Sequence, residues 1–225
     1  MVFHAYNNLL KRHPFKTNMM STGILFGAGD GLAQWMFPHR DHDDHETSFN
    51  YQRTARAMIY GSMFFAPLAV MWYGKKLPTL KNPFVSQRVR ARMSPFGAEF
   101  SDVLFRVGID QLFVPGLVWI PLYNVVMTTL ALHEHPLDLA YEKLSNNWWN
   151  VLRASWTVWP IFQLFSFTFI PVHLRIVAAN FWSIGWNCFL SFVHNTPGHG
   201  KGTGKKLEEL VDIEDDAEEQ TMVYS

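Results

Sequence analysis

The sequence contains little cysteine and little charge. Cys188 is the only cysteine among 225 residues, which excludes an intramolecular disulfide and a cluster of thiolate metal ligands. Charged residues make up 17% of the chain, against about 25% in an average soluble protein. The 19 Lys and Arg residues balance the 19 Asp and Glu residues, so the chain lacks the net positive field with which proteins attract nucleic acid.

The charges that are present avoid four apolar stretches, residues 17–37, 57–74, 107–132 and 154–193. Within these stretches the charged side chains are Asp30, Asp110 and Arg175. Each stretch approaches or exceeds the roughly 20 residues that a helix needs to cross a hydrocarbon core of about 30 Å. Backbone groups in lipid must be hydrogen-bonded within the protein, which favours helices. The pattern therefore predicts an all-α integral membrane helical bundle with about four transmembrane helices.

The last apolar stretch is too long for one crossing. Its 40 residues would form a helix of about 60 Å at about 1.5 Å per residue. Pro171, followed by the polar His173 and Arg175, predicts a break that leaves helices over 156–170 and 176–193. If one of these lies partly in the interface the chain has four crossings, and if both cross it has five.

The two ends of the chain differ in character. Residues 1–198 are predicted to form a single helical membrane domain, and residues 199–225 a disordered, solvated acidic tail. The first 29 residues contain no Asp or Glu and place apolar residues at helical spacing beside Lys11, Arg12 and Lys16. Such a start suits a mitochondrial import segment or an interfacial helix, and a plain helix leading into the first span fits equally well.

Basic residues weakly predict how the chain is oriented in the membrane, and aromatic residues mark where the predicted spans end. The N-terminal segment and the 75–106 connector hold most of the Lys and Arg residues outside the spans, so both are expected on the same side of the membrane. Aromatic rings near the predicted span ends fit belts at the two headgroup regions; these rings are Trp35, Trp72, Tyr73, Trp148, Trp149 and Trp156.

Two kinds of residue inside the spans are candidates for specific roles. Gly23, Gly27 and Gly31 form overlapping small-x-x-x-small steps, which let a neighbouring helix approach closely. Polar residues at membrane depth form the candidate site: Asp30, Gln34, Asp110, Gln111, Gln163, Arg175, Asn180 and Asn187. A carboxylate there must be paired, hydrated or neutralised, and Arg175 is the available opposite charge.

These polar residues support two interpretations. They can line a hydrated path through the bundle, or they can act as a polar clamp that joins helices. For Asp30 and Gln34 both remain open, and a path would make this pair the determinant of selectivity. For Asp110 the clamp is favoured.

Enzyme chemistry has no visible site in the sequence. His39, His42 and His45 lie among acidic residues, where a solvated loop is a better interpretation than a metal site because nothing fixes ligand geometry. There is no phosphate-binding loop, nucleophile elbow or zinc-protease motif. The sequence predicts no catalytic residue, no metal and no cofactor.

The order and spacing of many uncommon residues resemble one family, the Mpv-seventeen family, also called the peroxisomal membrane protein twenty-two kilodalton family. The matching segments are Gly23-Ile24-Leu25, Gly29-Asp30, Arg53-Thr54-Ala55-Arg56, Tyr60-Gly61, Trp72-Tyr73, Asp110-Gln111, Trp156-Thr157-Val158-Trp159-Pro160, Ile170-Pro171 and Trp186-Asn187. The chain is most similar to the fungal mitochondrial members, with Lys11-Arg12 and the long connector contributing to that similarity.

The resemblance implies a protein of the mitochondrial inner membrane, or alternatively of the peroxisomal membrane. It implies a small, weakly selective channel involved in membrane homeostasis, stress tolerance and mitochondrial DNA maintenance. The alternative is a structural organiser of an organelle membrane that recruits partners without transport. The expected partners are the lipid bilayer, further copies of the chain or a membrane complex, and small solutes, with no nucleic acid.

Overall fold

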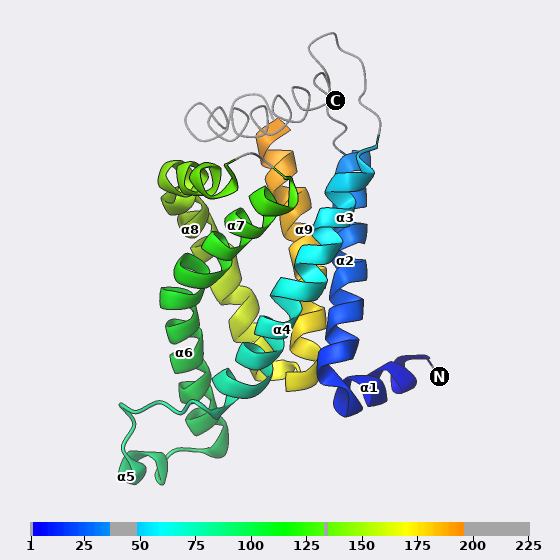
Figure 1. Ribbon diagram of the computed structural model, residues 1–225. Helices are drawn as coiled ribbons and strands as arrows, with labels where there is room; N and C mark the ends of the chain where they lie inside the picture. Colours follow the sequence, from blue (N-terminus) through cyan, green and yellow to red (C-terminus); the bar gives the residue numbers. More distant parts are fainter. Residues whose placement is uncertain (1, 37–48, 133–134, 196–225) are drawn as a thin grey trace, which may run out of the picture.

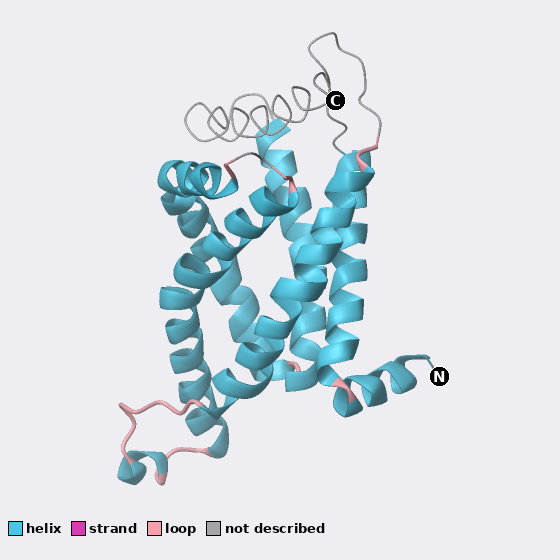
Figure 2. Ribbon diagram, in the orientation of Figure 1, coloured by secondary structure: helices cyan, strands magenta, loops and turns pink. Residues whose placement is uncertain are grey.

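The computed structural model describes residues 2–36, 49–132 and 135–195, and the side chains of 4–36, 49–132 and 135–185. These residues are helical apart from short turns (Figure 2). The elements in chain order are α1 (Val2–Arg12), α2 (Pro14–Met36), α3 (Tyr51–Ile59), η1 (Tyr60–Phe65), α4 (Ala66–Ala69), η2 (Val70–Lys76), η3 (Leu77–Thr79), α5 (Gln87–Arg90), α6 (Pro95–Val114), η4 (Pro115–Trp119), α7 (Ile120–Leu130), α8 (Pro136–Phe169), η5 (Val172–Leu174) and α9 (Arg175–Asn195). The acidic tail and His39, His42 and His45 lie outside the described residues.

The long helices form an elongated bundle (Figure 1). The helix α2 packs against α3 and α9, and α8 packs against α6 and α7. At the lower end in Figure 1, α1 projects sideways from the foot of α2, and the connector that holds α5 projects from the same end of the bundle. The N-terminal segment and the basic connector therefore lie at the same end of the bundle.

Two continuous helical runs in the described residues are long and apolar enough to cross a membrane. They cover Tyr51–Thr79 and Pro95–Leu130, and in their most apolar windows 28% and 44% of the residues are buried. A core helix of a soluble protein would be mostly buried, so these runs expose apolar surface to their surroundings. The predicted spans at 17–37 and 154–193 are also helical, in α2 and in α8 with α9. Their described residues are not among the runs that are long and apolar enough to cross a membrane.

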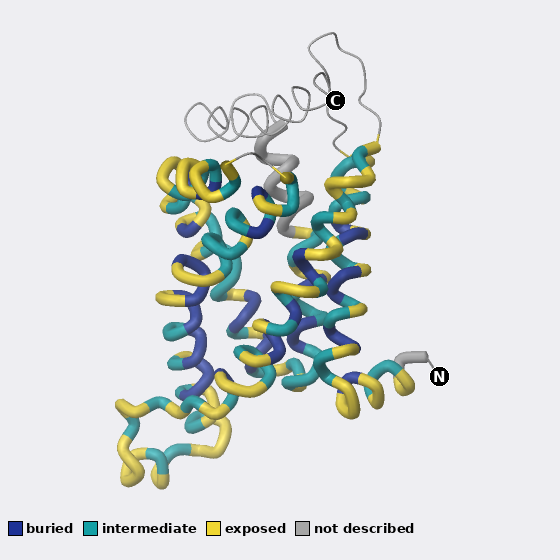
Figure 3. Tube along the Cα trace, viewed as in Figure 1, coloured by how far each residue is buried: buried dark blue, intermediate teal, exposed yellow. Residues whose placement is uncertain are grey.

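Figure 3 shows which segments of the bundle are buried and which are exposed. The exposed residues include many large apolar ones, and the buried residues include many polar ones. Large apolar side chains are exposed along the long helices, including Ile24, Met63, Leu112, Leu117, Ile161 and Phe181. Polar side chains are buried between the helices, including Thr22, Asp102, Asp110, Gln163, Ser166 and Asn180. Water would favour the reverse distribution, whereas lipid favours this one.

The break in the last apolar stretch occurs at Pro171, as predicted. The helix α8 ends at Phe169, Ile170 is extended, and α9 begins at Arg175 after the single turn η5. The start of α8 differs from the expected boundary, because the helix begins at Pro136 rather than near residue 154. Hydropathy marks the apolar part of a helix, and α8 continues through a polar segment that this signal cannot detect.

Glycines allow α2 and the α3–η1 segment to approach closely. A Cβ atom at Gly27 would lie 2.6 Å from Cγ of Met58, and one at Gly23 would lie 3.1 Å from Cβ of Ser62. At Gly31 the nearest atom would be Cζ of Phe49 at 3.7 Å, an ordinary contact. Two of the three glycines of the motif thus face a neighbouring helix without room for a side chain.

We expect Gly27→Leu to lower the free energy of unfolding by roughly 1–3 kcal/mol, because the added side chain overlaps Met58. Thermal unfolding of the detergent-solubilised protein measures this effect. Gly108→Leu is the matched control, since no atom lies within 4 Å of a Cβ placed at Gly108. Equal destabilisation by the two variants would contradict a specific α2–α3 contact.

Candidate functional site

A buried carboxylate, Asp110 of α6, forms the centre of the first polar network. Its Oδ1 accepts a hydrogen bond from the Trp72 indole at 2.5 Å, and its Oδ2 accepts one from the Gln163 amide at 2.6 Å. Longer contacts to Oδ2 come from Gln111 at 3.3 Å and from the Tyr73 hydroxyl at 3.5 Å. Three segments that are distant in sequence, η2, α6 and α8, are thereby joined at one residue.

Two acceptor atoms of the Asp110 network have no hydrogen-bond donor. Asp110 is 0% exposed, and none of the ion pairs in the described residues includes it. The Oε1 atoms of Gln111 and Gln163 are also buried, without a hydrogen-bond partner. Four neutral donors thus replace the hydration shell of the carboxylate, while two amide oxygens remain available to a donor. Such a cluster suits a cation, a water molecule or a hydrogen-bond-donating solute better than an anion.

The position of Trp72 differs from its predicted role. The sequence pattern assigns this residue to an aromatic belt at the headgroups, but its indole donates to Asp110 inside the bundle. The prediction is wrong for Trp72 because an indole N–H near a span boundary can point towards an interior acceptor as readily as towards lipid headgroups. Trp35, which is 77% exposed, fits the belt interpretation better.

The second network joins α2 to the start of α3 around Asp30. Oδ2 of Asp30 accepts hydrogen bonds from the Thr54 hydroxyl at 2.6 Å and the Gln34 amide at 2.8 Å. Oδ1 accepts from Nε of Arg53 at 2.9 Å. The backbone N–H of Asn50 donates to Oε1 of Gln34 at 2.7 Å, and the Gln34 amide donates to the Asn50 carbonyl at 3.1 Å.

The arrangement around Asp30 has the geometry of a clamp. Both carboxylate oxygens and both ends of the Gln34 amide have partners on α2 or at the start of α3. The counter-charge is Arg53, whereas the sequence offered Arg175 as the opposite charge within the spans. Arg53 could have been found as the basic residue that begins the segment Arg53-Thr54-Ala55-Arg56, but only the fold brings it within reach of Asp30.

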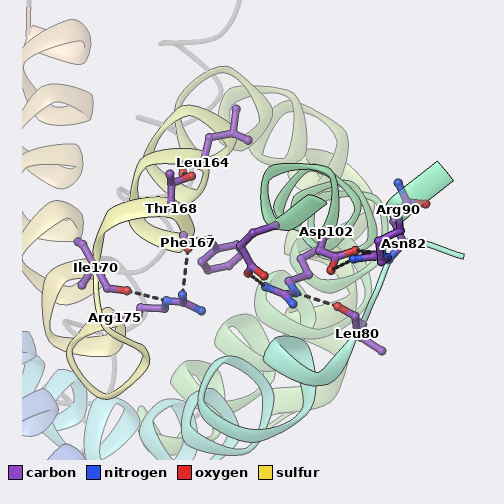
Figure 4. A network of polar contacts seen from close by, with 11 residues as sticks. Leu80, Asn82, Arg90, Asp102, Leu164, Phe167, Thr168, Ile170 and Arg175 are labelled. Carbon is purple, nitrogen blue, oxygen red and sulfur yellow. Dashed lines mark hydrogen bonds and ion pairs between the residues drawn. The ribbon is translucent and has the colours of Figure 1, made fainter. Parts of the chain in front are cut away.

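Arg175 stabilises the break between α8 and α9 (Figure 4). Its guanidinium donates to the carbonyls of Phe167 at 3.0 Å and Ile170 at 3.1 Å and lies over the Phe167 ring. In a continuous α-helix, residue 171 would donate to the Phe167 carbonyl, but Pro171 has no N–H. Arg175 therefore supplies the missing donor and pairs with neither predicted carboxylate.

The remaining predicted polar residues lie apart from these networks. The Asn180 amide donates to the Thr22 hydroxyl at 2.8 Å, which links α9 to α2 at a buried position. The side chain of Asn187 lies outside the described residues. The structure thus brings Asp110, Gln111 and Gln163 together, and separately Asp30 and Gln34.

Two further prolines have the same consequence for the backbone as Pro171. Pro115 cannot donate to the carbonyl of Gln111, and the indole of Trp156 donates to that carbonyl at 2.8 Å. The turn that follows is π-helical: the N–H of Ile120 donates to the carbonyl of Pro115, five residues earlier. In the same pattern the carbonyl of Gly116 would accept from the N–H of residue 121, but residue 121 is a proline and has no N–H. The indole of Trp148 donates to the Gly116 carbonyl at 2.8 Å.

A third polar network, absent from the sequence predictions, attaches the connector to α6 (Figure 4). Asp102 is 2% exposed and accepts a bidentate pair from Arg90 at 2.6 and 2.8 Å, together with the backbone N–H of Asn82 at 2.8 Å. Arg106 donates to the Leu80 carbonyl at 2.8 Å and to Glu99 at 2.9 Å. Asp102 lies outside the apolar stretches, so a search for charge within spans could not find it.

Comparison with known proteins identifies relatives over most of the chain. The model of the Mpv17 / PMP22 family matches residues 130–191. Protein SYM1 of Debaryomyces hansenii is 42% identical over 194 residues, which cover 86% of this chain and 89% of that protein. Protein SYM1 of Candida albicans is 41% identical, with 85% and 96% covered, and that of Saccharomyces cerevisiae is 35% identical, with 85% and 89% covered. No solved structure matches the chain.

We expect Trp156→Phe to lower the free energy of unfolding by roughly 1–3 kcal/mol, because it leaves the Gln111 carbonyl without a donor. The same change should cost less in a Pro115→Ala background, where the backbone N–H of residue 115 can donate to this carbonyl. A double-mutant cycle measured by thermal unfolding in detergent tests the coupling. Trp149→Phe, at a half-exposed ring, is the control, and additive losses for Trp156→Phe and Pro115→Ala would contradict the assignment.

Proposed function

The chain belongs to the Mpv17 / PMP22 family of membrane proteins, and on this premise we propose that it forms a small, weakly selective channel in the mitochondrial inner membrane. The proposal depends on the Asp110 network, in which a buried carboxylate has donors but no cation, and two neighbouring amide oxygens have no partner. Burying these groups at membrane depth costs several kcal/mol unless a polar solute or water can reach them.

The chemistry of the network sets the proposed selectivity. The acceptors of Asp110, Gln111 and Gln163 favour cations and neutral hydrogen-bond donors, and they repel anions. Asp110 is fully buried, so the described conformation is closed at this level. Opening would require α8 to move relative to α6, which would exchange the Gln163 hydrogen bond for water or solute. The Asp30–Gln34 pair, closed by Arg53 and Thr54, would then maintain the α2–α3 contact during opening.

In the cell, a pore of this kind would relieve solute imbalance across the inner membrane. Such a role is compatible with involvement in membrane homeostasis, stress tolerance and mitochondrial DNA maintenance. The acid-free N-terminal segment supports mitochondrial import, because α1 places apolar side chains beside Lys11 and Arg12. A peroxisomal membrane is the alternative location.

A second candidate function, a structural organiser of the membrane, is favoured by the closed networks at Asp30 and Asp102. Both carboxylates have a counter-charge and further donors, which is the arrangement of fixed joints between segments. An organiser would present the apolar outer surface or the connector to further copies of the chain or to a membrane complex. It would not conduct.

We expect the full-length chain to enter isolated mitochondria and to resist carbonate extraction, because the two long apolar runs expose their surfaces to lipid. Protease treatment of mitochondria and of mitoplasts measures the location, and a tag before α1 should share the accessibility of a tag in the α5 connector. Recovery in the carbonate supernatant, or import only into peroxisomes, would contradict the proposed location.

We expect the purified protein to conduct in planar bilayers with a preference for cations over anions. Asp110→Asn should reduce that preference, because it removes the buried negative charge while it preserves the shape of the side chain. Reversal potentials in asymmetric salt measure the permeability ratio. Asp138→Asn, at an exposed site near the start of α8, is the matched control and should leave the ratio unchanged.

The outcomes separate the two functions. Silent bilayers from correctly folded protein would reject the channel and favour the organiser. Conduction with the same shift in both variants would show that Asp110 does not contact the path.

A further inference from the structure

A cavity of about 340 Å³ lies at the end of the bundle where α1 joins α2. It is enclosed by α1, the first turns of α2, η2 and the start of α9 with the preceding turn. Its lining residues are Leu10, Lys11, Pro14, Asn18, Val70, Gly74, Lys75, Val172, His173 and Ile176. It shares no residue with the Asp110 or Asp30 networks.

The polar part of this cavity is basic. Lys11 and Lys75 are exposed residues from two different elements, and His173 lies between α8 and α9. None of the described residues that line the cavity is a carboxylate. The Lys75 ammonium lies 4.8 Å from the centroid of the Phe15 ring, a contact that leaves its charge uncompensated. Two cations on separate elements thus converge on an opening without a negative group.

A buried polar side chain supports the assignment of a ligand site. Asn18 is 3% exposed, and its amide nitrogen donates to the Pro14 carbonyl at 2.7 Å. Its Oδ1 is buried without a hydrogen-bond partner, although the residue lines the cavity. A donor that reaches this acceptor, such as the hydroxyl group of a ligand, would satisfy it.

His173 has a defined role at the cavity wall. Its Nε2 lies 2.6 Å from Oδ1 of Asn7, which joins α1 to the α8–α9 turn. The two lysines supply the positive charge at the cavity.

We propose that this cavity binds a phosphate group that carries a hydroxyl-bearing substituent. Lys11 and Lys75 would hold the phosphate oxygens at the mouth, and Oδ1 of Asn18 would accept a hydrogen bond from the hydroxyl. The apolar wall formed by Val70, Val172 and Ile176 would contact the carbon skeleton. Two sources share this chemistry: the phosphoglycerol headgroup of an anionic lipid, and a soluble phosphate ester.

The test uses the full-length protein purified in a neutral detergent. Native mass spectrometry measures retention of phosphatidylglycerol against phosphatidylcholine, and calorimetry measures binding of glycerol 3-phosphate and inorganic phosphate. We expect the double variant Lys11→Gln/Lys75→Gln to weaken binding at least about tenfold, since each lysine beside an anionic group contributes about 1 kcal/mol. Arg12→Gln/Lys76→Gln is the matched control, because it removes the same charge from the adjacent exposed positions, which do not line the cavity.

Gly74→Leu provides a second variant without a change in charge. A Cβ at Gly74 would meet no atom nearer than Cγ1 of Val70 at 3.9 Å, so the leucine can occupy cavity volume without disturbing the helix. Loss of phosphatidylglycerol in both test variants, with retention in the control, would identify a lipid site. Loss of glycerol 3-phosphate binding with the same pattern would identify a soluble ligand. Absence of binding by either class, or equal weakening in the control, would overturn the proposal, and none of these outcomes depends on conduction.

Discussion

The need to satisfy every backbone carbonyl inside an apolar environment is the constraint on which this bundle depends. Prolines within and between its long helices lack the N–H groups that would otherwise satisfy the preceding turn. Side-chain N–H groups from elsewhere in the fold replace them: Trp156 at the Gln111 carbonyl, Trp148 at the Gly116 carbonyl and Arg175 at the Phe167 carbonyl. These replacements also position α6, η4 and α8 relative to one another.

The same environment governs the carboxylates, and each is stabilised in its own way. Asp30 and Asp102 have an arginine partner together with further donors, which makes them rigid connections between segments. Asp110 has only neutral donors, so its charge is solvated by the protein without being cancelled. That difference explains why the proposed path is assigned to Asp110 although Asp30 is equally prominent in the sequence.

The two ends of the bundle are chemically distinct. The end with α1 and the α5 connector carries the basic cavity and the Asp102 network, and the opposite end carries the Asp30 clamp. A membrane protein with one basic end has a preferred orientation, because positive segments resist translocation. The proposed phosphate site lies at this basic end, and the proposed path lies in the polar interior between the helices.

The sequence by itself determined the helical class, the exposed apolar surface, the break at Pro171 and the family, because hydropathy and proline act locally along the chain. It also singled out Asp30, Gln34, Asp110, Gln111 and Gln163 as polar residues within apolar stretches. Only the tertiary structure decided their partners. Arg53 rather than Arg175 reaches Asp30, and Trp72 turns inward to Asp110, because distances between helices and the directions of side chains depend on packing that no local pattern encodes.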